Sequence, residues 1–228
     1  MRPLPQAPAD RFNFAEHLLA QNAGRAEKVA YVDDAGALTY GQLADRVRRL
    51  AAGLRELGLR REDRVLVLMH DSAAWPVVFL GALYAGVVPV AVNTLLASGD
   101  YAYMLEHSRA QAAFVSGPLL PTLQAAMADA RHEARAVVAS GGDAQAALDL
   151  EEILRRSEPA ALPAPTGADE PAFWLYSSGS TGRPKGAVHT HANLYWTAEL
   201  YGKPVLGLRE DDICFSAAKL FFAYGLGN

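Results

Sequence analysis

The stretch YSSGSTGRPKG, residues 176–186, constrains this chain more than any other part of its sequence. It contains three glycines, four Ser or Thr hydroxyls and two cations, and it follows the apolar run Ala172–Leu175. Glycine lets backbone N–H groups turn toward an anion, and successive N–H groups form an anion-binding nest. The pattern therefore predicts a strand that leads into a flexible phosphate-binding loop, here called the phosphate loop. A plain solvated Gly/Ser turn would not need so many matched donors.

The candidate phosphate-binding residues are the hydroxyls, the first two glycines and the lysine of this loop: Ser177, Ser178, Gly179, Ser180, Thr181, Gly182 and Lys185. Ser and Thr hydroxyls donate hydrogen bonds, and a lysine supplies a mobile point charge suited to a polyphosphate. The loop is not a Walker A motif, because Arg183 and Pro184 separate Gly182 from the lysine and Gly186 follows it.

Composition excludes several classes of protein. With 51% hydrophobic residues among 228, the chain can bury a substantial core and is not disordered as a whole. A net charge of −4 leaves no basic surplus for nucleic acid. Cys214 is the single cysteine, so no internal disulfide can form, which suits a reducing cytoplasm. Its apolar neighbours, Ile213 and Phe215, favour a buried structural thiol over a nucleophile.

Neither the N-terminal residues nor the longest apolar run predicts a membrane protein. The N-terminal residues 1–8 have no apolar core of a signal peptide. The run Pro76–Val92 is almost free of polar side chains, but it is short for a membrane span and is interrupted by Gly81, Gly86 and Pro89. A buried helix followed by a buried strand explains it better. We expect a cytoplasmic protein with no membrane and no nucleic-acid partner.

Most of the chain alternates between strand and helix patterns. Thr39 and Gln42 form a capping box that opens the clearest helix, which Gly58 ends. Ser72 is the expected cap of the next helix. The other expected helices cover residues 12–21, 72–86, 100–107, 121–130, 148–156 and a stretch from Thr190 to about 202. The expected strands cover 29–32, 38–40, 64–69, 87–92, 112–115, 136–139, 172–175 and 213–217.

This alternation predicts an α/β fold, with a parallel sheet flanked by helices. We expect residues 1–11 to form a flexible arm, 12–156 an α/β subdomain, 157–171 a Pro-rich linker, and 172–228 a phosphate-loop and pocket segment of the same large domain. His189 and His191 have a spacing that suits a metal pair, but no Cys, Asp or Glu stands nearby in the sequence. We therefore expect structural histidines and no metal ligands from this chain.

The phosphate loop resembles, position by position, the signature of the adenylate-forming enzymes, which include acyl-CoA synthetases, peptide-synthetase adenylation domains and luciferases. This resemblance implies that the chain is the N-terminal portion of their large domain. It also implies that Lys185 and Thr181 are catalytic and that the phosphate loop wraps the triphosphate of ATP. In that family the ribose-binding aspartate and the catalytic lysine of the C-terminal domain lie further along the chain, so we expect an N-terminal fragment with little activity alone.

The last residues resemble the aromatic-rich motif that lines the acyl pocket in this family. Phe222, Ala223, Tyr224 and Gly225 would hold the acid, with small residues allowing close approach and aromatic rings stacking on the substrate. Many relatives carry histidine where Phe222 stands. The sequence of residues 219–227, together with those of residues 88–96 and 101–105, resembles that of benzoate–CoA ligases.

The implied reaction joins benzoate to ATP, with Mg²⁺ on the phosphates, and then transfers the acyl group to coenzyme A. The partners are thus an aromatic carboxylate, ATP and coenzyme A, and a homodimer is one candidate for the oligomeric state. Two alternatives stay open at this point. The chain could adenylate another aryl or small acid, or it could be a non-catalytic binding module. A kinase or NTPase is a third, lower-ranked reading of a phosphate loop.

Overall fold

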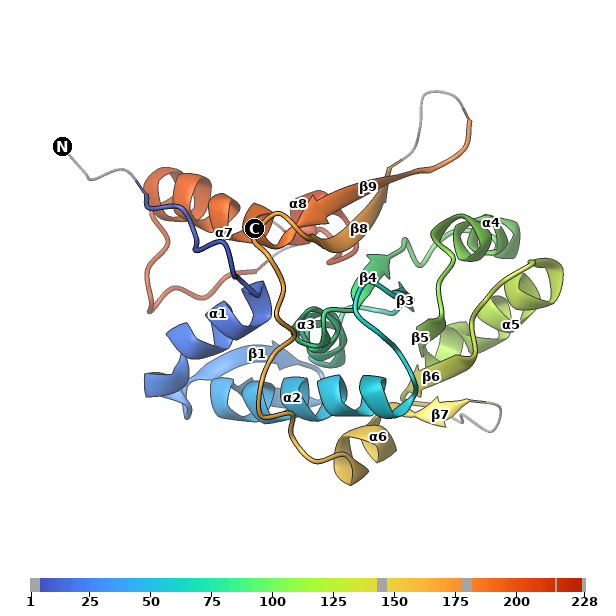
Figure 1. Ribbon diagram of the computed structural model, residues 1–228, viewed down its shortest axis with the longest axis horizontal. Helices are drawn as coiled ribbons and strands as arrows, with labels where there is room; N and C mark the ends of the chain where they lie inside the picture. The colour runs from blue at the N-terminus through green and yellow to red at the C-terminus, as the bar shows by residue number, and fades with distance from the viewer. Residues whose placement is uncertain (1–4, 143–146, 178–181, 216, 227–228) are drawn as a thin grey trace.

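The computed structural model describes residues 5–142, 147–177, 182–215 and 217–226. Within them, seven strands form one sheet in the order β7-β6-β5-β3-β4-β8-β9 (Figure 1). The strands are β3 (Arg64–Leu68), β4 (Val88–Ala91), β5 (Ala112–Ser116), β6 (Ala136–Ser140), β7 (Leu148–Asp149), β8 (Pro171–Ser177) and β9 (Lys185–Thr190). Neighbours from β7 to β8 are parallel, while β8 and β9 are antiparallel. The expected α/β fold is confirmed, with one antiparallel strand at an edge that was not foreseen.

The central strands face two separate hydrophobic cores. In β3, Val65 and Val67 pack into one cluster, whereas Leu66 and Leu68 pack into the other. All four side chains are fully buried. Successive side chains of a strand point to opposite faces, so a strand covered on both sides is apolar at every position. This explains the unbroken apolar run in the sequence.

Helices cover both faces of the sheet (Figure 1). The first cluster contains side chains of α1 (Phe14–Gln21), α2 (Tyr40–Glu56), α3 (Ala74–Ala85) and α6 (Leu150–Arg156). The second contains those of α4 (Ser98–Ser108) and α5 (Leu120–Asp129). Of the two short 3-10 turns, η1 (Ala23–Arg25) follows α1 and η2 (Gly117–Leu119) precedes α5. The sheet is therefore the middle layer of three.

The long apolar run Pro76–Val92 divides between α3 and β4. Of the twelve residues of α3, all but the first are buried, because the helix lies between the sheet and α1 and α2. Every residue of β4 is buried as well. The expected buried helix followed by a buried strand is confirmed. Within the described ranges, no helix is long and apolar enough to cross a membrane.

A separate hairpin leads into α2. Its strands are β1 (Val29–Asp33) and β2 (Gly36–Thr39), paired antiparallel. The capping box is confirmed: the Gln42 N–H donates to Thr39 Oγ1 at 3.2 Å, and the Thr39 N–H donates to Gln42 Oε1 at 2.9 Å. Gly58 follows the helix with φ +80°, a left-handed conformation that favours glycine.

The expected cap of α3 is wrong. The side chain of Ser72 makes no capping hydrogen bond in the structure. Instead, the hairpin supplies the acceptor: Asp33 Oδ2 accepts the N–H of Ala73 at 2.7 Å. The cap thus comes from a residue forty positions earlier, and the local sequence pattern around Ser72 does not indicate it. At the other end, Gly86 closes α3 with φ +74°, as its position predicts.

The Pro-rich segment that follows α6 runs back along the molecule to β8. The N–H of Ala160 donates to the carbonyl of Arg48 in α2 at 3.0 Å, and that of Ala164 to Tyr84 in α3 at 2.8 Å. Near the end of the segment, Thr166 Oγ1 donates to the carbonyl of Phe12 at 2.9 Å. These contacts hold residues 157–170 against the core. The domain boundaries drawn from the sequence stay a prediction.

The last part of the chain departs furthest from expectation. After β9 come α7 (His191–Thr197), the wider π-helical segment η3 (Ala198–Leu206) and the short α8 (Ala223–Leu226). The strand expected at 213–217 is wrong for its described residues: Ile213 is 98% exposed and Phe215 94% exposed. Cys214 is likewise exposed, so a buried thiol was also a wrong expectation. No described strand pairs with this segment.

Candidate functional site

The phosphate loop connects the two strands of the β8–β9 hairpin. Ser177 and Lys185 are the last register pair of that hairpin, next to the pair Tyr176 and Gly186. The predicted residues Ser178, Gly179, Ser180 and Thr181 lie outside the described residues. Ser177 and Lys185 are exposed, and Lys185 makes no ion pair within the described ranges. The hairpin projects from the sheet beside α4 (Figure 1).

Gly182 has a conformation that requires glycine. Its φ is +95°, which side-chain-bearing residues rarely adopt, although a Cβ there would meet nothing within 4 Å. The requirement thus comes from the backbone turn itself and not from a crowded neighbour. This supports the interpretation that Gly182 serves the backbone geometry of the loop.

Side chains of α4, to which the sequence analysis gave no role in the site, contact both arms of the hairpin. The Tyr103 hydroxyl donates to the carbonyl of Pro184 at 3.2 Å, and the Arg183 guanidinium carbon lies 5.3 Å from the centre of the Tyr103 ring. His107 Nδ1 lies 2.7 Å from the Tyr176 hydroxyl. Burial raises the pKa of Tyr176, so its hydroxyl keeps its proton at neutral pH.

The residues predicted to bind the acid separate in the structure. Ala223 and Tyr224 line a cavity of about 370 Å³, together with Phe173, Leu175, His189, Asn193, Leu194, Thr197, Tyr201 and Leu226. Gly225 lines a neighbouring, largely apolar cavity of about 470 Å³. Phe222 lines neither of these cavities; it is 44% exposed and packs edge-on against Phe221 at 4.6 Å between ring centres.

Gly225 is required by packing within the chain. A Cβ at this position would lie 2.1 Å from the carbonyl oxygen of Lys219 and 2.7 Å from that of Ala218. Real Cβ atoms do not approach so closely, so any larger residue would displace the backbone. The small size of Gly225 was expected to allow close contact with a ligand, but in the structure it avoids a clash with the backbone of the chain itself.

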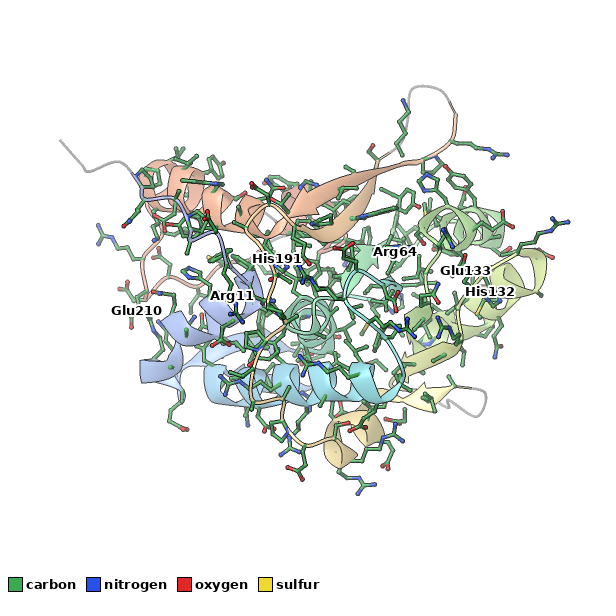
Figure 2. All side chains as sticks on the ribbon, viewed as in Figure 1. Arg11, Arg64, His132, Glu133, His191 and Glu210 are labelled. Carbon is green, nitrogen blue, oxygen red and sulfur yellow. The ribbon has the colours of Figure 1, made fainter. Side chains whose placement is uncertain are left out.

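Two histidines stand at the inner end of the hairpin. His189 stacks flat on Phe173, with ring centres 4.6 Å apart and planes 3° apart, and burial lowers its pKa. His191 is buried below the hairpin (Figure 2), and its Nδ1 accepts the N–H of Phe14 at 3.2 Å. Burial lowers the pKa of His191 to about 4. Both rings are therefore neutral at pH 7. The described residues contain no group of three or more His, Cys, Asp or Glu that could hold a metal.

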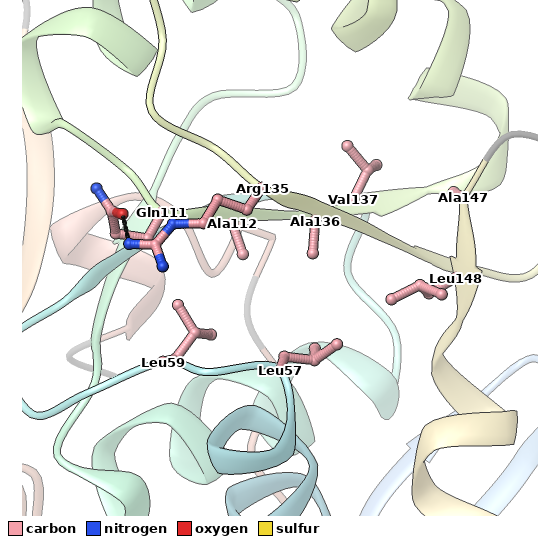
Figure 3. Close-up of a pocket in the computed structure, with 9 residues that line it drawn as sticks. All are labelled: Leu57, Leu59, Gln111, Ala112, Arg135, Ala136, Val137, Ala147 and Leu148. Atoms are coloured by element: carbon pink, nitrogen blue, oxygen red, sulfur yellow. Dashed lines mark hydrogen bonds between the residues drawn. The ribbon is translucent and has the colours of Figure 1, made fainter.

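Another cavity, of about 570 Å³, lies where β5 and β6 begin (Figure 3). Leu57 and Leu59 face the sheet across it, and Arg135 donates to Gln111 Oε1 at one end. None of the residues that the sequence predicts to bind phosphate or the acid lines this cavity. In parallel α/β sheets, ligands bind beyond the carboxyl ends of the strands. The phosphate loop follows the carboxyl end of β8, and this cavity lies at the opposite ends of β5 and β6.

Residues 18–228 match the family described as AMP-binding enzyme. A benzoate–CoA ligase from Thauera aromatica is 50% identical over 222 residues, which make up 96% of this chain and 42% of that relative. A 4-hydroxybenzoate–CoA/benzoate–CoA ligase from Rhodopseudomonas palustris is 42% identical over 97% of this chain and 41% of the relative. The chain thus spans roughly two fifths of the length of these relatives.

Solved structures give the same assignment. A benzoate CoA ligase from Burkholderia xenovorans LB400 superposes with a TM-score of 0.88 and 54% identity, over 95% of this chain and 42% of that one. An anthranilate CoA ligase, crystallised with anthranoyl-AMP, superposes with a TM-score of 0.92 and 32% identity, over 96% of this chain and 42% of that one.

Proposed function

Because the chain belongs to the AMP-binding enzyme family, we propose that it supplies the phosphate loop and the acyl cavity of an AMP-forming benzoate–CoA ligase. Several experiments below use a protein in which this chain is extended to the length of its relatives; it is called the full-length ligase. Its substrates would be benzoate, ATP and coenzyme A, and its products benzoyl-CoA, AMP and pyrophosphate. The names of the most similar relatives support benzoate as the acid.

One structural observation carries the proposal. Strand β8 serves both parts of the site: Leu175 lines the 370 Å³ cavity, and two residues later Ser177 begins the phosphate loop. An acid held in the cavity would therefore lie within a few residues' reach of the phosphates held by the loop. That proximity is what the joining of a carboxylate to a nucleotide requires.

In the first step, a carboxylate oxygen of benzoate would attack the α-phosphorus of ATP. The bond to the bridging oxygen would break, and pyrophosphate would leave with that electron pair. The physical difficulty is that two anions must meet. Lys185 and the backbone N–H groups of the loop would offset the phosphate charge. Ser177 and Thr181 would add hydroxyl donors.

Mg²⁺, proposed from the family resemblance alone, would help to offset the negative charge of the phosphates when it is bound with the nucleotide. Lys185 suits the role of offsetting phosphate charge, since it is exposed at the base of the loop and forms no ion pair with a described carboxylate. Thr181 stays a proposed catalytic residue from the family resemblance alone.

The cavity suits a flat, neutral ring. Its walls are aromatic and aliphatic, from Phe173, Leu175 and Tyr224, and His189 adds an uncharged face at pH 7. An aromatic ring gains from such walls by burial and by edge or face contacts. In the second step, the thiol of coenzyme A would attack the acyl carbon and release AMP. The single cysteine suits the reducing cytoplasm as the place of this reaction.

The test is benzoate-dependent release of pyrophosphate from ATP by the full-length ligase. We expect release with benzoate and little with acetate or octanoate. The 228-residue chain, shown to be folded by circular dichroism, is expected to release little with any acid. Release with octanoate but not benzoate would contradict the assignment of the acid.

The alternatives have distinct outcomes in the same assay. Release with another aryl acid in place of benzoate would identify a different acid with the same reaction. ATP hydrolysis that ignores carboxylates would indicate an NTPase. A folded full-length protein that neither binds nor cleaves ATP would be a binding module without chemistry.

A further inference from the structure

We infer that Tyr103 and His107 of α4 are positioning residues for the phosphate loop. They hold the two arms of the β8–β9 hairpin in place, so that Lys185 is presented at a fixed position to a polyphosphate. The polyphosphate as ligand rests on the proposed function, whereas the mechanical role rests on the contacts alone. Neither residue lies in the phosphate-loop motif or in the acyl cavity.

Tyr103 holds the arm that enters β9. Its hydroxyl donates to the carbonyl of Pro184, the residue immediately before Lys185, at 3.2 Å. Its ring lies under the Arg183 guanidinium at 5.3 Å, within the range of a cation–π contact. Two consecutive residues of the loop are thus held by one side chain, through one polar and one ring contact. This fixes the backbone that leads into the lysine.

His107 holds the arm that leaves β8. Its Nδ1 lies 2.7 Å from the hydroxyl of Tyr176, the residue immediately before Ser177. Its ring also meets the Trp174 ring edge-on, with centres 6.1 Å apart. Tyr176 and Trp174 alternate with Leu175, so they share the face of β8 opposite to the acyl cavity that Leu175 lines. Helix α4 therefore contacts the hairpin without entering the cavity.

The two residues act as one unit on a rigid support. Tyr103 and His107 are four positions apart on α4, which places them on one helix face, and their rings stack with centres 5.3 Å apart. The opposite face of α4 is fixed, because Tyr101, Met104 and Leu105 are buried in the second core cluster. The Tyr101 hydroxyl also donates to the carbonyl of Asn93 at 2.8 Å.

The hairpin needs such support. Among the described residues, β8 is joined to β4 by two register pairs, Val90 with Trp174 and Ala91 with Leu175. Beyond Leu175 the hairpin continues to Ser177 and Lys185 with no further pairing to β4. The contacts from α4 lie on this projecting part. They are thus placed to determine how firmly the base of the loop is held.

The first measurement is hydrogen exchange of the segment 185–190, followed by mass spectrometry on the full-length ligase. Tyr103→Leu removes both the hydrogen bond to Pro184 and the ring contact with Arg183. We expect amide exchange in that segment to become about tenfold faster, while the exchange rate in β3 does not change. Tyr103→Phe keeps the ring and loses only the hydroxyl, so its effect should be about threefold. His107→Ala should accelerate exchange as well. Tyr195→Leu is the matched control, since Tyr195 is a half-buried tyrosine whose hydroxyl donates to the carbonyl of Gln6.

The second measurement is the Kd for ATP with Mg²⁺ by calorimetry. We expect Tyr103→Leu to raise it about tenfold and Tyr103→Phe to restore most of the affinity, while the KM for benzoate stays within about twofold. Unchanged exchange in Tyr103→Leu would overturn the inference. Faster exchange with unchanged Kd would reduce the pair to a structural role and overturn positioning, as would failure of the unmodified protein to bind ATP. Failure of benzoate to trigger pyrophosphate release, with both expected shifts present, would contradict the proposed function and leave the positioning role supported.

Discussion

Gly81 of α3 lies against Leu50 of α2 so closely that a Cβ on the glycine would be 2.7 Å from Leu50 Cδ2 and 2.9 Å from its Cβ. Leu50 is fully buried, so it has little room to move aside. We expect Gly81→Ala to force the two helices apart and to lower the free energy of unfolding by about 1–3 kcal/mol. Urea denaturation followed by circular dichroism measures this. Gly99→Ala in α4 is the control, because a Cβ there meets nothing within 4 Å. Equal stability of the two variants would refute the close packing.

Acid should destabilise the fold through His191. Burial lowers its pKa from 6.5 to about 4, against the opposing effect of the nearby Glu170 carboxylate. The unfolded chain therefore binds a proton between these values that the folded chain does not. The stabilisation is complete above pH 6.5 and is lost as the pH falls, by about 1.5 kcal/mol between pH 6.5 and 5.

The matched variant for this effect is His191→Asn. Asn can still accept the N–H of Phe14 but does not titrate. Urea midpoints at pH 7, 6 and 5 should fall less steeply for the variant than for the unmodified protein. His17 and His189, whose pKa values burial also lowers, contribute equally to both proteins and cancel in the comparison. Parallel pH profiles would show that His191 does not couple folding to protons.

Lys185 should matter for chemistry and not for stability. It is exposed, so Lys185→Gln removes a charge without opening the core. We expect benzoate-dependent pyrophosphate release by the full-length ligase to fall about 10²-fold, because a preorganised donor to the phosphates is lost. The free energy of unfolding should change by less than about 0.5 kcal/mol. Lys28→Gln, at a partly exposed lysine that pairs with Glu210, should leave the rate unchanged.

Ala223 should limit the size of the acid. It lines the 370 Å³ cavity, and Ala223→Leu would fill part of that space. We expect kcat/KM for benzoate to fall about tenfold or more, with the KM for ATP within about twofold. The equivalent change at an exposed position of α5, Ala128→Leu, controls for the added hydrophobic surface. Equal kcat/KM values in the two variants would place the acid elsewhere.

Local signals in the sequence were sufficient for much of the fold. Thr39 and Gln42 predict the start of α2 because a capping box is satisfied within four residues. The apolar run of β3 predicts burial on both faces because a covered strand tolerates no polar position. The apolar run before the Gly/Ser-rich stretch predicts that the phosphate loop follows a strand, as it does after β8. In each case the determining contacts are near in sequence, or the residue type alone carries the information.

The errors arise where an element or a contact depends on what lies beside it in the fold and not on its own local sequence pattern. Strand β9 begins with Lys185 and Gly186, which have low β-propensity, and it forms because β8 offers a ladder to it. The apolar Ile213 and Phe215 suggest a strand, but no described strand pairs with them. Tyr103 and His107 were missed because their contacts with the hairpin span about seventy to eighty residues. The cap supplied by Asp33 to α3 is a further example.

The register pair of Ser177 with Lys185 has a consequence for chain entropy. A ladder that brings two backbone points together bears the main cost of closing whatever chain runs between them. Each doubling of the length of that chain adds only about 0.6 kcal/mol. Segments of different length and composition could therefore be grafted between these two residues while the sheet stays folded. The hairpin ladder thus carries much of the cost of closing the loop, although Gly182, with φ +95°, still has to be glycine.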